Sequence, residues 1–294
     1  MRTVFDIGGS RIRAGLARAP GRVEPLGAWP TPTDDYAAFV AVLRNAVAQG
    51  SVGAALSIAG VVDPETGVIT AANIPCLDGR NLAADLTRDL GLAVISGNDA
   101  DCFALAEARS GAGAGQRVVF GVILGTGVGG GVVIDGAIHQ GAGGFSGEWG
   151  HGPLVQLLAP ALAGWQCGCG LTGCMDTVGG ARGMERLYRQ FFGTERECAA
   201  ILVAWQAGDA AASQVVLQWL EMVSAALAVI VNVVGPSIVP VGGGLANSAE
   251  LIAALDERVR ARILQKRPEP LLVRAHHRVE PGMIGASWLG WANG

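Results

Sequence analysis

The stretch Thr3-Val-Phe-Asp-Ile-Gly-Gly-Ser10 has the pattern of an apolar strand that ends in an acidic residue and a paired-glycine turn. A second strand is predicted for residues 11–16, directly after that turn. The same order returns later as a strand over 118–124, the turn Gly125-Thr-Gly-Val-Gly-Gly-Gly131 and a strand over 132–134. This weak repeat indicates two similar halves. Because strands and helices mix throughout the chain, the sequence predicts an α/β fold.

Hydrophobic periodicity and turn signals predict the remaining elements. Helices are expected over residues 34–48, 81–90, 100–109, 176–191, 195–206, 210–233, 248–265 and 283–291. Further strands are expected over residues 52–58, 92–96, 237–241 and 271–275.

Composition describes a soluble globular protein. The chain has 294 residues, 50% of them hydrophobic, and a net charge of −4, which argues against a DNA-coating protein. The apolar stretch 225–234 is too short to span a bilayer and is expected to form a buried helix. The first ten residues lack the apolar run of a signal peptide. We therefore expect a cytoplasmic protein without a membrane or nucleic-acid partner.

One histidine and three clustered cysteines suggest a metal site. His151 precedes Cys167, Cys169 and Cys174, and three thiolates with one imidazole form a ligand set typical of structural Zn²⁺. The alternative is three unrelated buried cysteines, since the spacing of the three thiols is not that of a common zinc finger. The other three of the six cysteines are expected in the core.

The two glycine-rich turns allow two interpretations each. In Asp6-Ile-Gly-Gly-Ser10, backbone N–H groups could hold a phosphate and the acid could support Mg²⁺ through water, or the turn could be a plain hairpin. The turn over 125–131 is not a P-loop, because no lysine follows it. Nor does it fit a dinucleotide fingerprint, because a strand follows it. Its five glycines favour close contact with a ligand.

Several acids in the chain have a possible chemical role. Asn98-Asp99 stands at a predicted helix start, where it is either an N-cap or a hydrogen-bond donor followed by a general base. Glu148 and Asp176 flank the predicted metal loop. Sugars both donate and accept hydrogen bonds through each hydroxyl, so carboxylates and amides at this loop suit a polyol ligand.

These motifs occur in an order that resembles the ROK family of sugar kinases. The stretches Asp6–Ser10, Asn98–Ala100, Gly125–Gly131, Glu148–His151 and Cys167–Cys174 carry the resemblance, which covers the whole chain. Ala71-Ala-Asn-Ile-Pro75 and the residues around the second and third motifs are most similar to bacterial N-acetylglucosamine kinases.

The resemblance implies a two-lobed fold of the actin and hexokinase (ribonuclease H-like) type with a structural zinc loop. The small lobe would comprise residues 1–112 and 282–294. The large lobe would comprise residues 113–281, with the zinc loop and the nucleotide site. Sugar would bind between the lobes, ATP on the larger one, and a homodimer is a further expectation.

The resemblance also assigns roles to individual residues. Asp99 would be the base that takes the proton from the sugar 6-hydroxyl. The expected sugar contacts are Asn98, Glu148, His151, Asp176, Gly60 and Asn73. The expected ATP and Mg²⁺ contacts are Asp6, Gly8, Gly9, Ser10, Arg11, Thr126, Gly127 and Gly243. The expected zinc ligands are His151, Cys167, Cys169 and Cys174.

The expected activity is ATP-dependent phosphorylation of N-acetyl-D-glucosamine at its 6-hydroxyl. The alternatives are a glucokinase, an N-acetylmannosamine kinase, or a non-catalytic sugar-binding regulator. The family's regulators carry a helix-turn-helix ahead of the Asp-Ile-Gly-Gly motif, which here begins at residue 6.

This chain departs from the family pattern at four places. It has Asp176 where Glu is usual, Ser10-Arg11 where Thr-Lys is usual, Asp101 where Asn is usual, and Ala59-Gly60 where Pro-Gly is usual. Asp176 bears most on sugar identity, because its side chain is one methylene shorter and a lost hydroxyl contact in a polar pocket changes selectivity greatly.

Overall fold

The computed structural model describes residues 1–290, and the chain divides into two compact units. Within the described residues, the first unit combines Met1–Gln116, Gly131–Gly147 and residues 277–290. The second combines Arg117–Gly130 with Glu148–His276. The last residue of the helix predicted over 283–291, and the end of the small lobe predicted over 282–294, lie outside the described residues.

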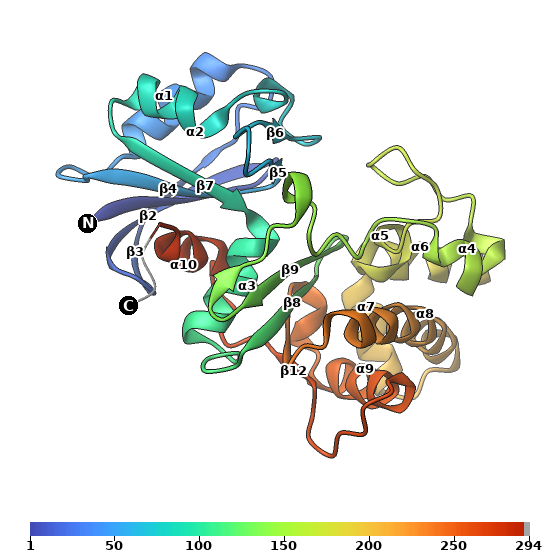
Figure 1. Ribbon diagram of the computed structural model, residues 1–294. Helices are drawn as coiled ribbons and strands as arrows, with labels where there is room; N and C mark the ends of the chain where they lie inside the picture. The colour runs from blue at the N-terminus through green and yellow to red at the C-terminus, as the bar shows by residue number, and fades with distance from the viewer. Residues whose placement is uncertain (291–294) are drawn as a thin grey trace. The chain divides into compact units, whose positions relative to one another are not determined.

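A five-stranded sheet forms the centre of the first unit, in the order β3-β2-β1-β4-β7 (Figure 1). Its strands are β1 (Arg2–Ile7), β2 (Arg11–Ala19), β3 (Arg22–Pro30), β4 (Gly53–Ile58) and β7 (Ala93–Asn98). β1, β4 and β7 run parallel, with Ile7 paired to Ile58 and Ile58 paired to Asn98. The carboxyl ends of all three strands therefore reach one edge of the sheet, where the predicted polar residues follow.

Helices cover both faces of this sheet (Figure 1). On one face lie α1 (Tyr36–Ala46) and α2 (Leu82–Leu90), and on the other α3 (Asp99–Ser110) and α10 (Pro281–Trp288). Fully buried Phe39, Leu43 and Leu86 from α1 and α2 share one apolar cluster with Leu56 of β4. The shorter elements of this unit are β5 (Val61–Val62), β6 (Ile69–Thr70), η1 (Pro75–Leu77), β10 (Ala137–Ile138) and η2 (Ala142–Gly144).

The contact between α10 and α3 depends on a glycine. A Cβ atom at Gly285 would lie 1.8 Å from the carbonyl oxygen of Cys102. We expect Gly285→Ala to lower the free energy of unfolding by about 3 kcal/mol or more, because overpacking against backbone outweighs the roughly 1 kcal/mol that alanine contributes to a helix. Urea denaturation measures this. Gly164→Ala, whose Cβ would meet nothing within 4 Å, is the control, and equal stability of the two variants would contradict the prediction.

The second sheet has the order β10-β9-β8-β11-β12, and its strand β9 crosses the boundary between the units at Gly131. Its longer strands are β8 (Val118–Leu124), β9 (Val128–Ile134), β11 (Val239–Gly242) and β12 (Leu272–Arg274). β11 runs parallel to both β8 and β12. The helices of the second unit are α4 (Leu154–Leu158), η3 (Pro160–Leu162), α5 (Asp176–Gly179), α6 (Ala181–Phe192), α7 (Cys198–Gln206), α8 (Ala210–Val234), η4 (Gly244–Asn247) and α9 (Ala249–Arg262).

Helix α8 is the centre of the helical part of this unit and contacts α6, α7 and α9. It is the one helix among residues 1–290 with the length and hydropathy of a membrane span, but 61% of its most apolar window is buried. Trp219 is fully buried on it and donates from Nε1 to the carbonyl oxygen of Gly179 at 3.0 Å. This burial is typical of the core helix of a soluble protein.

The structure differs from the predicted elements in several places. The short strand β10 and helix α4 were not predicted, and β9 begins at Val128, inside the turn predicted over 125–131, instead of at residue 132. Strand β3 and the β5–β6 hairpin were not predicted, and β3 is an exposed edge strand that tolerates Pro25 without an alternating pattern. The helix predicted over 176–191 is broken at Gly180, whose backbone is extended. The break occurs because Ala181 donates its N–H to Gly125 instead of continuing a helix.

Candidate active site and zinc loop

Asn98 and Asp99 stand where β7 ends and α3 begins. The Asn98 side chain accepts from the N–H groups of Ala100 and Asp101 at 2.8 and 3.1 Å, which confirms the N-cap interpretation. Its Nδ2 donates to the carbonyl oxygen of Gly60 at 3.0 Å. Asp99 is half-buried in the first turn, where the helix dipole favours a negative charge. A general base needs that charge, so its catalytic role stays a prediction compatible with this position.

The first glycine turn joins β1 to β2. Gly8 donates its N–H to Arg11 at 2.9 Å, and a Cβ at Gly9 would lie 3.1 Å from the Cβ of Asn73. The structure therefore brings Asn73 against Gly9, two residues predicted to serve sugar and ATP respectively. Ser10 and Arg11 are exposed. Thr31 of the region after β3, which sequence reasoning missed, donates its hydroxyl to Gly8 at 2.7 Å.

Asp6 is held by two neighbours at this turn. It accepts from the Ser57 hydroxyl at 3.1 Å and lies 3.5 Å from the guanidinium of Arg13. Burial raises the pKa of Asp6, and both neighbours oppose that rise. Arg13 also lies 3.6 Å from Glu280. Arg13 was not predicted from the sequence. It could have been found only from the register of the β1–β2 pair, in which Arg13 stands directly opposite Asp6.

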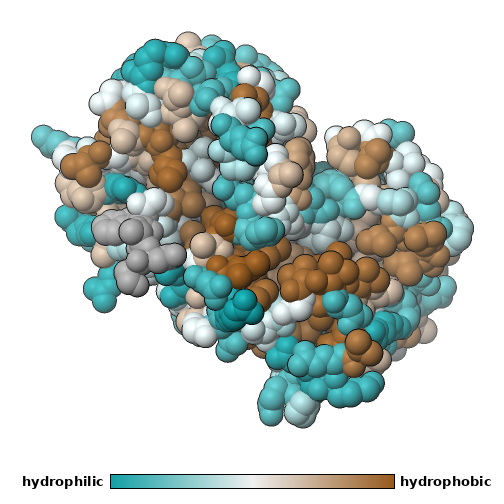
Figure 2. Space-filling model, viewed as in Figure 1, coloured by the Kyte–Doolittle hydropathy of each residue, from teal (hydrophilic) through white to brown (hydrophobic). Residues whose placement is uncertain are grey.

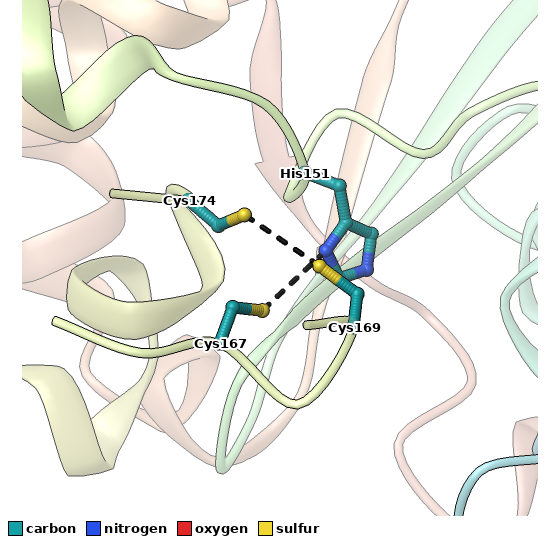
Figure 3. A group of neighbouring side chains, drawn as sticks. All are labelled: His151, Cys167, Cys169 and Cys174. Carbon is teal, nitrogen blue, oxygen red and sulfur yellow. Dashed lines mark hydrogen bonds between the residues drawn. The ribbon is translucent and has the colours of Figure 1, made fainter. Parts of the chain in front are cut away.

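The four predicted zinc ligands converge in the second unit (Figure 3). Their ligand atoms all lie within 4.8 Å of one another. Sγ of Cys169 and Sγ of Cys174 are 3.7 Å apart, and Sγ of Cys167 is 3.6 Å from Nδ1 of His151. Tetrahedral zinc, with bonds of about 2.3 Å to sulfur and 2.0 Å to nitrogen, needs separations of about 3.8 Å between two sulfurs and about 3.5 Å between sulfur and nitrogen. The donor set and its spacing fit zinc.

The three thiols of the loop differ in their exposure. Cys167 and Cys174 are buried, whereas Cys169 is exposed. Burial raises the pKa of the Cys167 thiol to about 12, so binding of zinc would require the positive charge of the ion to displace the thiol proton. Zinc would supply that charge and hold the loop closed, without a reactive position of its own.

His151 has its two ring nitrogens in different surroundings. Nδ1 faces Cys167, and Nε2 lies 3.5 Å from Oε2 of Glu148. Burial raises the pKa of Glu148, and the neighbouring His151 opposes that rise. A metal-bound histidine usually donates a hydrogen bond from its second ring N–H to a nearby carboxylate, which fixes the orientation of the ring. Glu148 is therefore positioned by the same residue that would bind zinc.

The second glycine turn is packed against the segment that follows the cysteines. The Val128 N–H donates to Oδ1 of Asp176 at 2.8 Å, and a Cβ at Gly127 would lie 2.2 Å from the same oxygen. Gly243 has a φ of +87°, and its Cβ would lie 2.3 Å from the Leu124 oxygen. Close internal packing thus explains two of these glycines, and their contact with ATP stays a prediction. Thr126 is exposed.

Trp149 was not predicted as a functional residue. Its side chain is buried, and its Nε1 donates to the carbonyl oxygen of Gly129 at 2.8 Å. The signal available in the sequence was its place between Glu148 and His151. The hydrogen bond from Trp149 to Gly129 connects the segment Glu148–His151, where the predicted zinc loop begins, to β9.

The predicted site residues are divided between the two units. The first unit contains Asp6, Gly8, Gly9, Ser10, Arg11, Gly60, Asn73, Asn98 and Asp99. The second contains Thr126, Gly127, Glu148, His151, Cys167, Cys169, Cys174, Asp176 and Gly243.

Comparison with known proteins identifies the family. The family model described as "ROK family" matches residues 3–292. The N-acetyl-D-glucosamine kinases of Salmonella schwarzengrund and Citrobacter koseri are each 35% identical over 298 aligned residues, which cover 97% of both chains.

Solved structures agree with this match. The ROK hexokinase of Thermus thermophilus has a TM-score of 0.82 at 32% identity and covers 97% of this chain and 96% of its own. A ROK family glucokinase from Streptomyces griseus, in complex with glucose and AMPPNP, has a TM-score of 0.81 at 27% identity over 98% of each chain. The predicted α/β fold of the hexokinase type is confirmed. The chain belongs to the ROK family.

Proposed function

We propose that this protein is an ATP-dependent sugar kinase that phosphorylates the 6-hydroxyl of N-acetyl-D-glucosamine. The observation that carries the proposal is the 35% identity, over 97% of both chains, to enzymes named N-acetyl-D-glucosamine kinase. The zinc-compatible loop and the helix-start acid Asp99 support it, because both are parts that the family resemblance implies. Cytoplasmic location, the lobe boundaries and a homodimer are further parts of the proposal.

In this proposal, Asp99 accepts the proton of the 6-hydroxyl as that oxygen attacks the terminal phosphorus of ATP. Proton removal by a positioned base contributes about 10²–10⁴-fold to such rates. Mg-ATP, when bound, supplies the phosphoryl group and neutralises its charge. The remainder of catalysis is positioning of the two substrates in line.

The sugar is held by carboxylate, amide and imidazole groups. Asn98, Glu148 and His151 are proposed to contact hydroxyls other than the 6-hydroxyl, and Gly60 and Asn73 to line the pocket. The family resemblance also predicts a sugar contact for Asp176. Nδ2 of Asn98 donates to the carbonyl oxygen of Gly60 at 3.0 Å. This hydrogen bond fixes both the orientation of the Asn98 amide and the position of Gly60 in the proposed pocket wall.

The phosphates of ATP are proposed to meet the backbone of the two glycine turns. Gly8, Gly9, Ser10 and Arg11 belong to the first turn, Thr126 and Gly127 to the second, and Gly243 follows β11. Asp6 is proposed to support Mg²⁺ through water, as carboxylates do for this strongly hydrated ion. Arg13, which lies 3.5 Å from Asp6, would keep that carboxylate ionised and aligned.

A sugar panel tests the proposal. Purified protein with Mg-ATP is given N-acetylglucosamine, N-acetylmannosamine, glucose or fructose, and ADP release is followed by a coupled assay. We expect the highest kcat/KM with N-acetylglucosamine and a phosphate on O6 by ³¹P NMR. The 6-deoxy analogue of N-acetylglucosamine should bind without release of ADP. Release with none of the four sugars would contradict a kinase acting on any of them.

A glucose kinase is the second candidate, supported by the hexokinase and glucokinase structures at 32% and 27% identity. A higher kcat/KM with glucose than with N-acetylglucosamine would establish it and keep the mechanism. It would also identify Asp176 and the wall at Ala59-Gly60 as the places to examine for the change in sugar.

A further inference from the structure

We infer that Asp176 is a positioning residue for the nucleotide turn, which it ties to the zinc loop. The inference rests on the proposed function, since it assigns Asp176 a role in ATP binding besides the predicted sugar contact. We call Gly125–Gly130 the nucleotide turn and Glu148–Asp176 the zinc loop. Both belong to the second unit.

The Asp176 carboxylate lies between the two segments. Its Oδ1 accepts from the N–H of Val128 at 2.8 Å, and its Oδ2 lies 3.7 Å from Sγ of Cys167. Asp176 follows Cys174 by two residues and donates its own N–H to Gly150 at 2.8 Å. The carboxylate of Asp176 thus connects the predicted zinc ligand Cys167 with the backbone of the nucleotide turn. The backbone N–H of Asp176 joins the same residue to Gly150, which directly precedes His151.

Val128 is enclosed by the same segments. A Cβ at Gly150 would lie 2.7 Å from Cγ2 of Val128, and a Cβ at Gly179 would lie 2.7 Å from Cγ1. Glycine at both positions allows the zinc loop and α5 to close on this side chain. The Val128 N–H and both of its methyl groups are therefore held by residues 150–179.

The start of α6 holds the other half of the turn. Ala181 donates its N–H to Gly125 at 2.8 Å, and a Cβ at Gly180 would lie 2.4 Å from the Thr126 oxygen. Within the turn, Gly125 donates to Gly127 at 2.9 Å. The carbonyl groups of residues 125 and 126 therefore face the start of α6, and that of residue 127 faces the turn itself. The backbone conformation that the turn would present to a nucleotide thus depends on residues 176–182.

The shortness of Asp176 suits this contact. The resemblance makes Glu the usual residue here, and the additional methylene of Glu would carry the carboxylate further from its own backbone. Oδ1 of Asp176 is already 2.2 Å from the position of a Cβ on Gly127, so the space beside the turn is filled by this oxygen. Any contact of Asp176 with sugar would therefore fall to Oδ2.

Binding of AMPPNP without sugar tests the inference directly. By calorimetry we expect Asp176→Ala to weaken AMPPNP binding about 10-fold, the effect of removing one hydrogen bond to a charged acceptor. Asp176→Asn keeps an oxygen acceptor for Val128 and should restore most of the affinity. In kinetics, Asp176→Ala should raise KM for ATP. Hydrogen exchange should show faster exchange of the Val128 amide.

Asp209→Ala is the matched control. Asp209 also accepts a backbone N–H, from Ala212 at 2.8 Å, but at the start of α8. It should leave AMPPNP affinity unchanged. Equal AMPPNP affinity of Asp176→Ala and the unmutated protein, with a raised KM for sugar alone, would overturn the inference and leave the proposed function intact. No binding of AMPPNP by the unmutated protein would instead refute the proposed function.

Discussion

Asp99→Asn is expected to lower kcat by about 10³-fold while sugar affinity stays close to that of the unmutated protein, because the amide cannot accept the proton of the 6-hydroxyl. The amide oxygen can still accept the N–H of Ala100, which Asp99 receives at 2.9 Å. The start of α3 should therefore remain intact. Single-turnover kinetics measures the loss, and calorimetry with the sugar measures the retained binding.

Asp101→Asn is the control for this variant. Asp101 is an acid in the same helix turn, and Asn is the usual residue there by the family resemblance, so this change should leave kcat within a few-fold. If Asp99→Asn instead turned over at nearly the unmutated rate, Asp99 would not be the base. A large loss of kcat in Asp101→Asn, but not in Asp99→Asn, would assign the role of base to Asp101.

Removal of zinc is expected to abolish sugar binding and to loosen residues 148–176. Metal analysis of the purified protein should give one zinc per chain, held by the quartet of His151, Cys167, Cys169 and Cys174. Structural zinc contributes about 10–16 kcal/mol of apparent binding free energy in small zinc-binding peptides, so the loop should not keep its shape without it. Calorimetry with sugar and hydrogen exchange over residues 148–176 measure the two effects.

Two variants separate the metal from cysteine loss in general. Cys174→Ser removes a ligand and should reproduce the effect of chelation, whereas Cys76→Ser removes a half-buried thiol outside the quartet and should not. Nucleotide affinity should also fall on chelation, because Asp176 connects the loop to Val128. A metal-free preparation with full activity would refute the structural role of zinc.

The sequence predicted features that depend on local chemistry. The repeat of strand, glycine turn and strand could be predicted because apolar runs favour strands and glycines favour turns through local backbone conformation. The zinc quartet is visible because few residue types bind this metal, and its spacing in the structure fits that prediction. The N-cap role of Asn98 follows from its place at a helix start, and its hydrogen bonds to Ala100 and Asp101 confirm it.

Features that depend on distant partners were not predictable. Asp176 meets Val128 across 48 positions in the sequence, and no local pattern marks that pair. Trp149 and Gly129 meet across 20 positions. Strand β3 was missed because it lies at the edge of its sheet, mostly exposed, where partner strands rather than side-chain alternation define it. The same dependence on packing breaks the predicted helix at Gly180.

The enclosure of the nucleotide turn restricts how this part of the protein can evolve or be engineered. A Cβ at Gly127 would lie 2.2 Å from Oδ1 of the Asp176 side chain, so a larger residue there requires Asp176 to move or change with it. A Cβ at Gly180 would lie 2.4 Å from the backbone oxygen of Thr126, which no side-chain substitution removes. Thr126, which directly precedes Gly127, is exposed. Under the proposed function, Thr126 is the exposed position of residues 125–127, which makes it the natural start for a mutational library aimed at the phosphoryl donor.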